Sequence, residues 1–226
     1  MLPDNSILWS DEDLLVVDKP AGLRVIPDGY DPQLPTLVGL LQSEWGKLWV
    51  IHRLDKDTSG VILFGRSAEA HRSLNQQFAS RLVSKVYHAF AAGSPDWDQR
   101  KVNFPLRING DRGHRTIVDL HKGKPAHTDL KVVKRQPLYC LIEARPHTGY
   151  THQIRAHLAA CGLPLLGDPL YQYPPSWTGS KVDLKSLPLI GRTALHALEI
   201  HFQHPGTGQE MVFSAPYPSD FQILIA

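Results

Sequence analysis

A short polar segment, residues 51–60, gathers charged and hydroxyl side chains between two apolar stretches. It reads IHRLDKDTSG, and loops of this kind often carry functional residues. Its central acid, Asp55, lies between Arg53 and Lys56, and cations that point towards a carboxyl keep it ionised. An ionised carboxylate suits a nucleophile or a stabiliser of positive charge better than a general acid. The end of the segment, from Asp57 to Gly60, is also compatible with an ordinary Asx-type turn.

A second segment, HTGYTHQIRAH from His147 to His157, carries three histidines spaced five residues apart. On an α-helix, five residues turn the chain through about 500°, so successive histidines lie about 140° apart and share no face. The i,i+4 spacing of helical zinc pairs is missing, and we expect no metal ion. A helix that begins at Thr151 would instead place Gln153 and Arg155 near its N-terminus, where anions bind.

Two strand-like segments add further polar candidates. In SKVYHA, period-two alternation puts Lys85 and Tyr87 on one face of a strand. Taken alone, this pattern fits an ordinary cross-strand tyrosine better than a functional one. In ALHA, near the C-terminus, His196 lies in an apolar strand, and a buried, hydrogen-bonded histidine is again the simpler interpretation.

The elements that must position these side chains follow from apolar periodicity and turn residues. We predict strands at 7–9, 14–18, 61–64, 85–92, 128–133, 139–144, 195–202 and 211–213. We predict helices at 36–45, from a Ser67 cap to about Phe78, at 151–161 and at 219–225.

Strands outnumber helices in this interpretation, and no regular βαβ alternation occurs. The expected fold is therefore α+β, with a mixed, largely antiparallel central sheet flanked by helices and loops. The Pro-, Gly- and Ser-rich stretch 172–192 is interpreted as a loop and not as a domain boundary, so we expect a single domain over residues 1–226.

Charge is distributed unevenly along the chain. The 226 residues carry 24 Lys and Arg against 22 Asp and Glu, a formal net charge of +2 that excludes a wholly basic, histone-like protein. Residues 100–135 nevertheless hold ten bases and three acids, so this segment is +7 and the remainder of the chain is −5. The segment forms either a basic face for a polyanion or a solvated stretch whose charges point in several directions.

The cysteines and the apolar runs indicate in which cellular compartment the protein is expected. The two cysteines have no Cys-x-x-Cys spacing, which excludes a thiolate zinc site or a thioredoxin-like motif, and we interpret them as reduced. The N-terminal segment lacks a basic region followed by an apolar stretch, and no apolar run approaches 18 residues. We therefore expect a cytoplasmic protein without a membrane span.

Motifs spread over about 200 residues together resemble those of the RluA-type pseudouridine synthases. In chain order they are DEDLLVVDKPAG at 11–22, HRLD with TSG at 52–60, Lys85-x-Tyr87-x-Ala89, TG followed by HQIRxHL at 148–158, the residues Leu165, Gly167, Asp168 and Tyr171, and LHA at 195–197. The resemblance implies a pseudouridine synthase catalytic domain. It also implies that uridine in ribosomal or transfer RNA is isomerised without a cofactor.

In that reaction the N1–C1′ bond is cut, the uracil rotates in place and C5 joins C1′. The resemblance implies that Asp55 is the catalytic aspartate, which could attack C1′, stabilise its positive charge or take a sugar proton. It further implies that Arg155 pairs with Asp55, that Tyr87 stacks on the uracil, and that Arg53 helps to hold RNA with the target base flipped out. We expect substrate binding from further residues: His52, Lys85, Gln153 and His196.

This sequence departs from the family pattern in two places. Tyr150 stands where the family usually has Arg or Lys, which weakens a phosphate contact or leaves a stacking surface. The family opening starts close to residue 10, so we expect no N-terminal S4-type RNA-binding domain, and we expect a monomer that grips RNA with its basic segment. Two other hypotheses stay open: a non-catalytic RNA-binding or ribosome-assembly module on the same fold, and a metal-dependent hydrolase.

Overall fold

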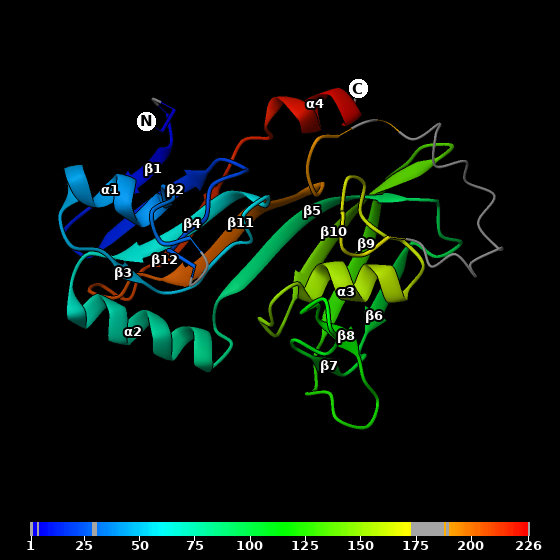
Figure 1. Cartoon of the computed structure of the whole chain (residues 1–226). Coiled ribbons are helices and arrows are strands. Elements are labelled where there is room, and N and C mark those ends of the chain that lie inside the picture. Colours follow the sequence, from blue (N-terminus) through cyan, green and yellow to red (C-terminus); the bar gives the residue numbers. More distant parts are fainter. Residues whose placement is uncertain (1, 4, 29–30, 173–187, 189, 226) are drawn as a thin grey trace. The chain divides into compact units, whose positions relative to one another are not determined.

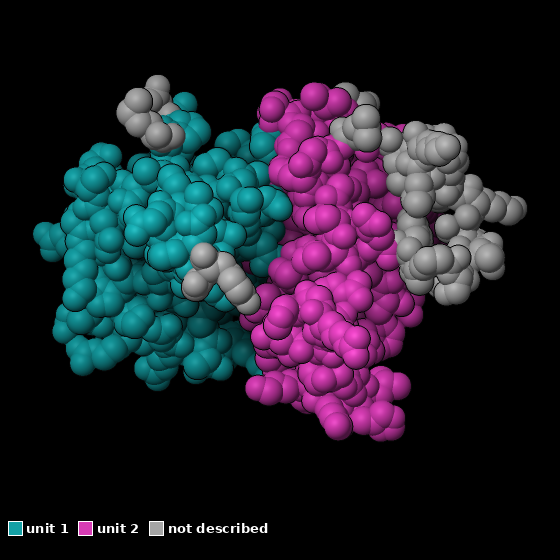
Figure 2. Space-filling view, in the orientation of Figure 1, with its two compact units in different colours: residues 1–85, 196–218 teal, residues 86–195, 219–226 magenta. Residues whose placement is uncertain are grey.

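The computed structural model describes residues 2–3, 5–28, 31–172, 188 and 190–225, and Figure 1 shows its elements. The chain forms two compact units, coloured separately in Figure 2. Unit 1 comprises residues 1–85 and 196–218, and unit 2 comprises residues 86–195 and 219–226. That residues 1–226 form a single domain stays a prediction. Most of the expected loop at 172–192 lies outside the described residues.

Unit 1 combines short strands with two helices. Its strands are β1 (Ile7–Ser10), β2 (Leu14–Lys19), β3 (Trp49–Val50), β4 (Ser59–Gly65), β11 (Leu195–Gln203, from His196) and β12 (Glu210–Ser214), and its helices are α1 (Leu37–Trp45) and α2 (Ala68–Ala79). The strands run in the order β1-β2-β4-β11-β12, and β3 pairs with β4. The β4–β11 pair is parallel, and the other strand pairs described in this unit are antiparallel.

The two helices of unit 1 begin at side-chain caps, and its central strands are apolar. The Thr36 hydroxyl accepts from the Gly39 N–H, and the Ser67 hydroxyl accepts from the Ala70 N–H, so each satisfies a backbone donor of the first helical turn. Every residue of β4 is buried, and so is nearly all of β2, which explains the apolar runs Leu14–Val17 and Val61–Phe64 inside these strands.

Unit 2 is built on antiparallel strands and carries two further helices among its described residues. Its larger sheet has the order β5-β10-β9-β6, and β7 and β8 form a small separate pair. The strands are β5 (Ser84–Ala92, from Val86), β6 (Gln99–Val102), β7 (Leu106–Arg107), β8 (Ile117–Val118), β9 (Thr128–Arg135) and β10 (Tyr139–Pro146). The helices are α3 (Gln153–Ala160) and α4 (Ser219–Ile225).

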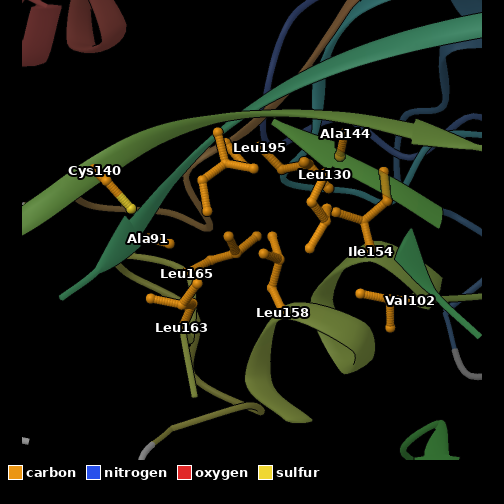
Figure 3. Packing of buried hydrophobic residues seen from close by; sticks show 12 residues of the cluster. Ala91, Val102, Leu130, Cys140, Ala144, Ile154, Leu158, Leu163, Leu165 and Leu195 are labelled. Atoms are coloured by element: carbon orange, nitrogen blue, oxygen red, sulfur yellow. The ribbon is translucent and has the colours of Figure 1, made fainter. Parts of the chain in front are cut away.

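The core of unit 2 lies between α3 and one face of its sheet, as Figure 3 shows. Ile154 and Leu158 of α3 pack with Leu130 of β9 and with Ala144 of β10. These side chains are 6% exposed or less, and their burial from water stabilises the position of the helix. The sheet face that supports α3 therefore also fixes the polar residues at the start of that helix.

The structure confirms the predicted α+β class with a mixed, largely antiparallel sheet. The strands β3, β6, β7 and β8 were not predicted, because two to four residues are too few to show a period. Helix α3 begins at Gln153 and not at Thr151, since His152 adopts a left-handed conformation with φ +55°. No helix among the described residues is long and apolar enough to cross a membrane.

Candidate active site

The loop that carries Asp55 is held from within unit 1 by a buried lysine. Lys19, the last residue of β2, is fully buried. Its Nζ donates to the carbonyl oxygens of Pro20 and Leu23, both at 2.8 Å, and of Lys56 at 3.0 Å. Because Lys56 follows Asp55 directly, this charge-assisted hydrogen bond fixes the backbone beside the candidate catalytic carboxylate.

The loop ends in a turn and leads straight into β4. The Thr58 N–H donates to the Asp55 carbonyl at 3.1 Å. The buried Ser59 hydroxyl lies 2.9 Å from Nδ1 of His196, and Nε2 of His196 lies 3.3 Å from the Ala215 carbonyl. A carbonyl only accepts, so Nε2 carries the proton and Nδ1 accepts from the hydroxyl. The fully buried His196 thus fastens the end of the loop, which favours a positioning role over contact with a substrate.

The side chains of His52 and Lys85 both contact the ring of Phe78 in α2. The His52 ring stacks on Phe78 with centroids 5.0 Å apart, and Nζ of Lys85 lies 5.7 Å from the Phe78 centroid. Nε2 of His52 accepts from the Leu63 N–H at 3.1 Å. Burial, assisted by the charge of Lys85, lowers the pKa of His52 to about 3, and burial also lowers the pKa of Lys85. His52 is therefore a neutral anchor between loop and strand.

In unit 2, Arg155 is held by a buried carboxylate. Nε of Arg155 donates to Oδ2 of Asp168 at 2.7 Å, and Nη2 donates to Oδ1 at 2.8 Å. The side chains are only 6% and 0% exposed. The guanidinium also lies over the Tyr171 ring, 5.1 Å from its centroid. A bidentate pair of this kind fixes the plane of the guanidinium as well as its position.

Gln153, the first residue of α3, is saturated by hydrogen bonds. Its Oε1 accepts from the Thr148 hydroxyl at 2.8 Å and from the Tyr150 N–H at 3.2 Å. Its Nε2 donates to the His127 carbonyl and to the Thr128 hydroxyl, both at 2.9 Å. These bonds tie the helix start to the start of β9. They favour a positioning role for Gln153 over the expected contact with a substrate.

The two tyrosines of the motifs lie in different surroundings in unit 2. Tyr87, on β5, is opposite Ala144 of β10 and packs half-buried against the core shown in Figure 3. Tyr150 packs half-buried against a smaller cluster that includes Ala156 and Tyr171. Where the family usually has a cation, this chain therefore has a tyrosine that contributes to apolar packing.

The three histidines of the second segment each have a separate partner. His157 is fully buried, and burial lowers its pKa. The partners are Asp129 for His147, the Tyr171 hydroxyl for His152, and Thr128 with the Phe104 carbonyl for His157. In the described part of the chain, no group of three or more His, Cys, Asp or Glu side chains is placed to hold a metal ion.

The basic segment 100–135 lies in unit 2, and its acids neutralise particular partners. Asp111 pairs with Arg115 and Asp119 with Arg107, each at 2.7 Å. Six exposed bases make no ion pair with any described residue: Arg100, Lys101, Arg112, Lys122, Lys124 and Lys131. The surplus charge of the segment therefore stands on side chains that solvent, or a polyanion, can reach.

The predicted site residues are distributed over both units. Unit 1 carries Asp55, which is half-buried, and the exposed Arg53, and it brings His52 close to Lys85. Unit 2 carries Tyr87, Arg155 and Gln153. The pairing of Arg155 with Asp55 stays a prediction. Sequence reasoning missed the role of Asp168, whose only sequence signal was its place in a family-like motif.

Comparison with known proteins identifies the family. Residues 13–160 match the family model described as RNA pseudouridylate synthase, so the chain belongs to this family. It is 36% identical over 227 residues to the ribosomal large subunit pseudouridine synthase D of Neisseria meningitidis, covering 97% of this chain and 60% of that protein. It is 34% identical over 215 residues to the dual-specificity RNA pseudouridine synthase RluA of Pasteurella multocida, covering 95% of this chain and 94% of that protein.

The fold comparison agrees with the sequence comparison. The structure of the human RNA pseudouridylate synthase domain containing 4 matches with a TM-score of 0.76 at 26% identity, covering 96% of this chain and 90% of that one. The chain spans about 60% of the length of the Neisseria relative, so it corresponds to part of that protein.

Proposed function

We propose that this protein is an RNA pseudouridine synthase that isomerises specific uridines in ribosomal or transfer RNA without a cofactor. The family match carries the proposal, since residues 13–160 include the Asp55 loop, the Tyr87 strand and the Arg155 helix. Relatives named for the large ribosomal subunit and for dual specificity support RNA as the substrate class.

In the proposed reaction Asp55 acts at the sugar. Cleavage of the N1–C1′ bond builds positive charge at C1′, and a carboxylate can attack that carbon, stabilise the charge or take a sugar proton. Arg155 keeps this carboxylate ionised by pairing with it. Tyr87 stacks on the target uracil, and Arg53 helps to hold the RNA with the base flipped out, because a stacked uridine hides both reacting carbons.

The described contacts divide the remaining candidates by role. His52 and His196 are engaged inside unit 1, and Gln153 inside unit 2, so we propose that they position the loop and the helix. Lys85 is the only amine among these candidates, and burial lowers its pKa. The exposed bases of the segment 100–135 bind RNA phosphates. The protein works as a cytoplasmic monomer in this proposal, and light scattering of the purified protein tests its oligomeric state.

Chemical mapping of pseudouridines tests the function and identifies the substrate. Total RNA from cells with and without this gene product is compared, and the uridines that lose modification are located. We expect one or a few positions in ribosomal or transfer RNA to lose pseudouridine, and to regain it when purified protein is added. An unchanged map, with no activity of the purified protein on either RNA, would refute the proposal.

The non-catalytic alternative predicts a different outcome. An RNA-binding or ribosome-assembly module would bind RNA equally well with Asp55 replaced by Asn, and it would create no pseudouridine. Metal analysis addresses the hydrolase hypothesis, which requires stoichiometric metal in the purified protein.

A further inference from the structure

Asp168 belongs to a motif for which the proposed reaction gives no role. Its carboxylate is fully buried, although it is an acid of the kind that usually lies at the surface. A buried carboxylate is costly unless it is paired and hydrogen-bonded. The contacts that Asp168 makes therefore indicate the role of this buried acid.

Backbone hydrogen bonds fix the carboxylate of Asp168 independently of its pairing with Arg155. Its Oδ1 accepts from the N–H groups of Leu170 at 2.9 Å and Tyr171 at 3.2 Å. The same oxygen receives Nη2 of Arg155, and the second oxygen receives Nε. A turn thus orients the acid, and the acid orients the guanidinium along its Nε–Nη2 edge.

Tyr171, at the end of this turn, supports Arg155 from a second direction. Its ring lies against the guanidinium, and its hydroxyl accepts from the Thr116 N–H at 2.9 Å and donates to the Thr116 carbonyl at 3.0 Å. The plane of the guanidinium is therefore set by an anion at one edge and an aromatic ring at one face.

We propose that Asp168 is a positioning residue for the isomerisation: its buried carboxylate fixes the plane of Arg155, and with it the direction in which the outer N–H groups of that arginine donate. The side-on pair engages the Nε–H and one Nη2–H of the five N–H bonds of the guanidinium, so both the position and the plane of this group follow the carboxylate of Asp168. The inference rests on the proposed function, because it assigns Asp168 to the same reaction.

The test is the kinetic effect of Asp168→Asn, which preserves size and removes the charge. We expect kcat for pseudouridine formation to fall by about 10- to 100-fold, since small misplacements of a catalytic group cost rates of this order. KM for RNA should stay within about 3-fold, because Asp168 binds no RNA in this account. Asp168→Glu restores the charge and should recover part of the lost kcat.

The chain offers a matched control in a second bidentate pair of unit 2. Arg192 donates to Asp220 at 2.6 and 3.0 Å and lies 5.2 Å from the Phe221 ring centroid. Asp220→Asn breaks the same kind of contact outside the proposed site, and kcat should stay within about 2-fold of the wild type. Equal kcat in the Asp168→Asn and Asp220→Asn proteins, or no recovery in Asp168→Glu, would overturn the inference.

A spectroscopic measurement decides the matter if Asp168→Asn does not fold. In the folded wild-type protein, the buried Nε–H of Arg155 should exchange slowly with water and give a resolved ¹H–¹⁵N signal, assigned by its loss in Arg155→Lys. Exchange as fast as that of exposed arginines would contradict the proposal. A wild-type protein that forms no pseudouridine would instead refute the function itself, while an active wild type with a fully active Asp168→Asn variant refutes only the role of Asp168.

Discussion

Gly60 lies where the candidate catalytic loop enters β4, and its replacement by alanine tests the close approach of β4 to β11. The glycine has φ +112°, a conformation that side chains rarely adopt. A methyl group there would lie 2.1 Å from the carbonyl oxygen of Ala197 and 2.7 Å from its carbonyl carbon. Both atoms are backbone of the parallel partner strand, in register with Gly60, so they cannot move aside cheaply.

The cost of Gly60→Ala has two parts. The positive φ alone costs about 1–2 kcal/mol for a residue with a side chain. Forcing a methyl group against packed backbone adds about 1–3 kcal/mol. We therefore expect the free energy of unfolding to fall by about 2–5 kcal/mol, a large share of the stability of an ordinary domain.

Gly208 provides the matched control, in the turn between β11 and β12 of the same unit. It also has a positive φ, +72°, but a methyl group there meets no described atom within 4 Å. Gly208→Ala should cost only the conformational part, about 1–2 kcal/mol. Urea unfolding followed by circular dichroism measures both variants. Equal losses of stability would refute the close packing of β4 on β11 behind the loop.

Two further predictions concern the anchors of the loop. His52 is neutral when folded, with a pKa of about 3, and takes up a proton near pH 6.5 when unfolded. The stabilisation of the folded protein that comes from this neutral His52 is complete above pH 6.5 and is lost as the pH falls below it. Through this group, we expect the free energy of unfolding to decrease by about 2 kcal/mol from pH 7 to pH 5. The decrease should be absent in His52→Gln and present in His121→Gln, a control at an exposed histidine. Equal dependence of the unfolding free energy on pH in these two variants would contradict the prediction. Lys19→Met removes the hydrogen bonds to the carbonyls of Pro20, Leu23 and Lys56 and should lower the free energy of unfolding in urea by about 2–4 kcal/mol. The side chain of Lys56 is exposed, so Lys56→Met should lower it by less than about 0.5 kcal/mol. Identical urea midpoints for these two variants would refute the role of Lys19.

The sequence predicted much of the fold because its long elements have clear periods and caps. Ser67 caps α2 as expected, and α4 spans the predicted residues 219–225. The strand predicted at 61–64 is longer in the structure, since Ser59 and Gly60 pair with β11 far along the chain. Turn-like residues there concealed a strand that only tertiary pairing extends.

The candidate site was only partly visible in the sequence. Its motifs point to Asp55, Tyr87 and Arg155, but no local pattern connects Arg155 with Asp168, thirteen residues later. In the same way, the sequence could not decide which bases of residues 100–135 are exposed to solvent and which are paired with acids of the same segment. The pairs Arg107–Asp119 and Arg115–Asp111 show which bases are neutralised inside the segment.

The most direct test of the proposed function is the activity of Asp55→Asn on the RNA found by mapping. Asparagine has nearly the size of aspartate but cannot attack C1′ or balance its charge. We predict that pseudouridine formation falls by at least about 1000-fold, while RNA affinity and the urea midpoint stay close to those of the wild type. An Asp55→Asn protein with near wild-type activity would contradict the assignment of Asp55 and the mechanism built on it.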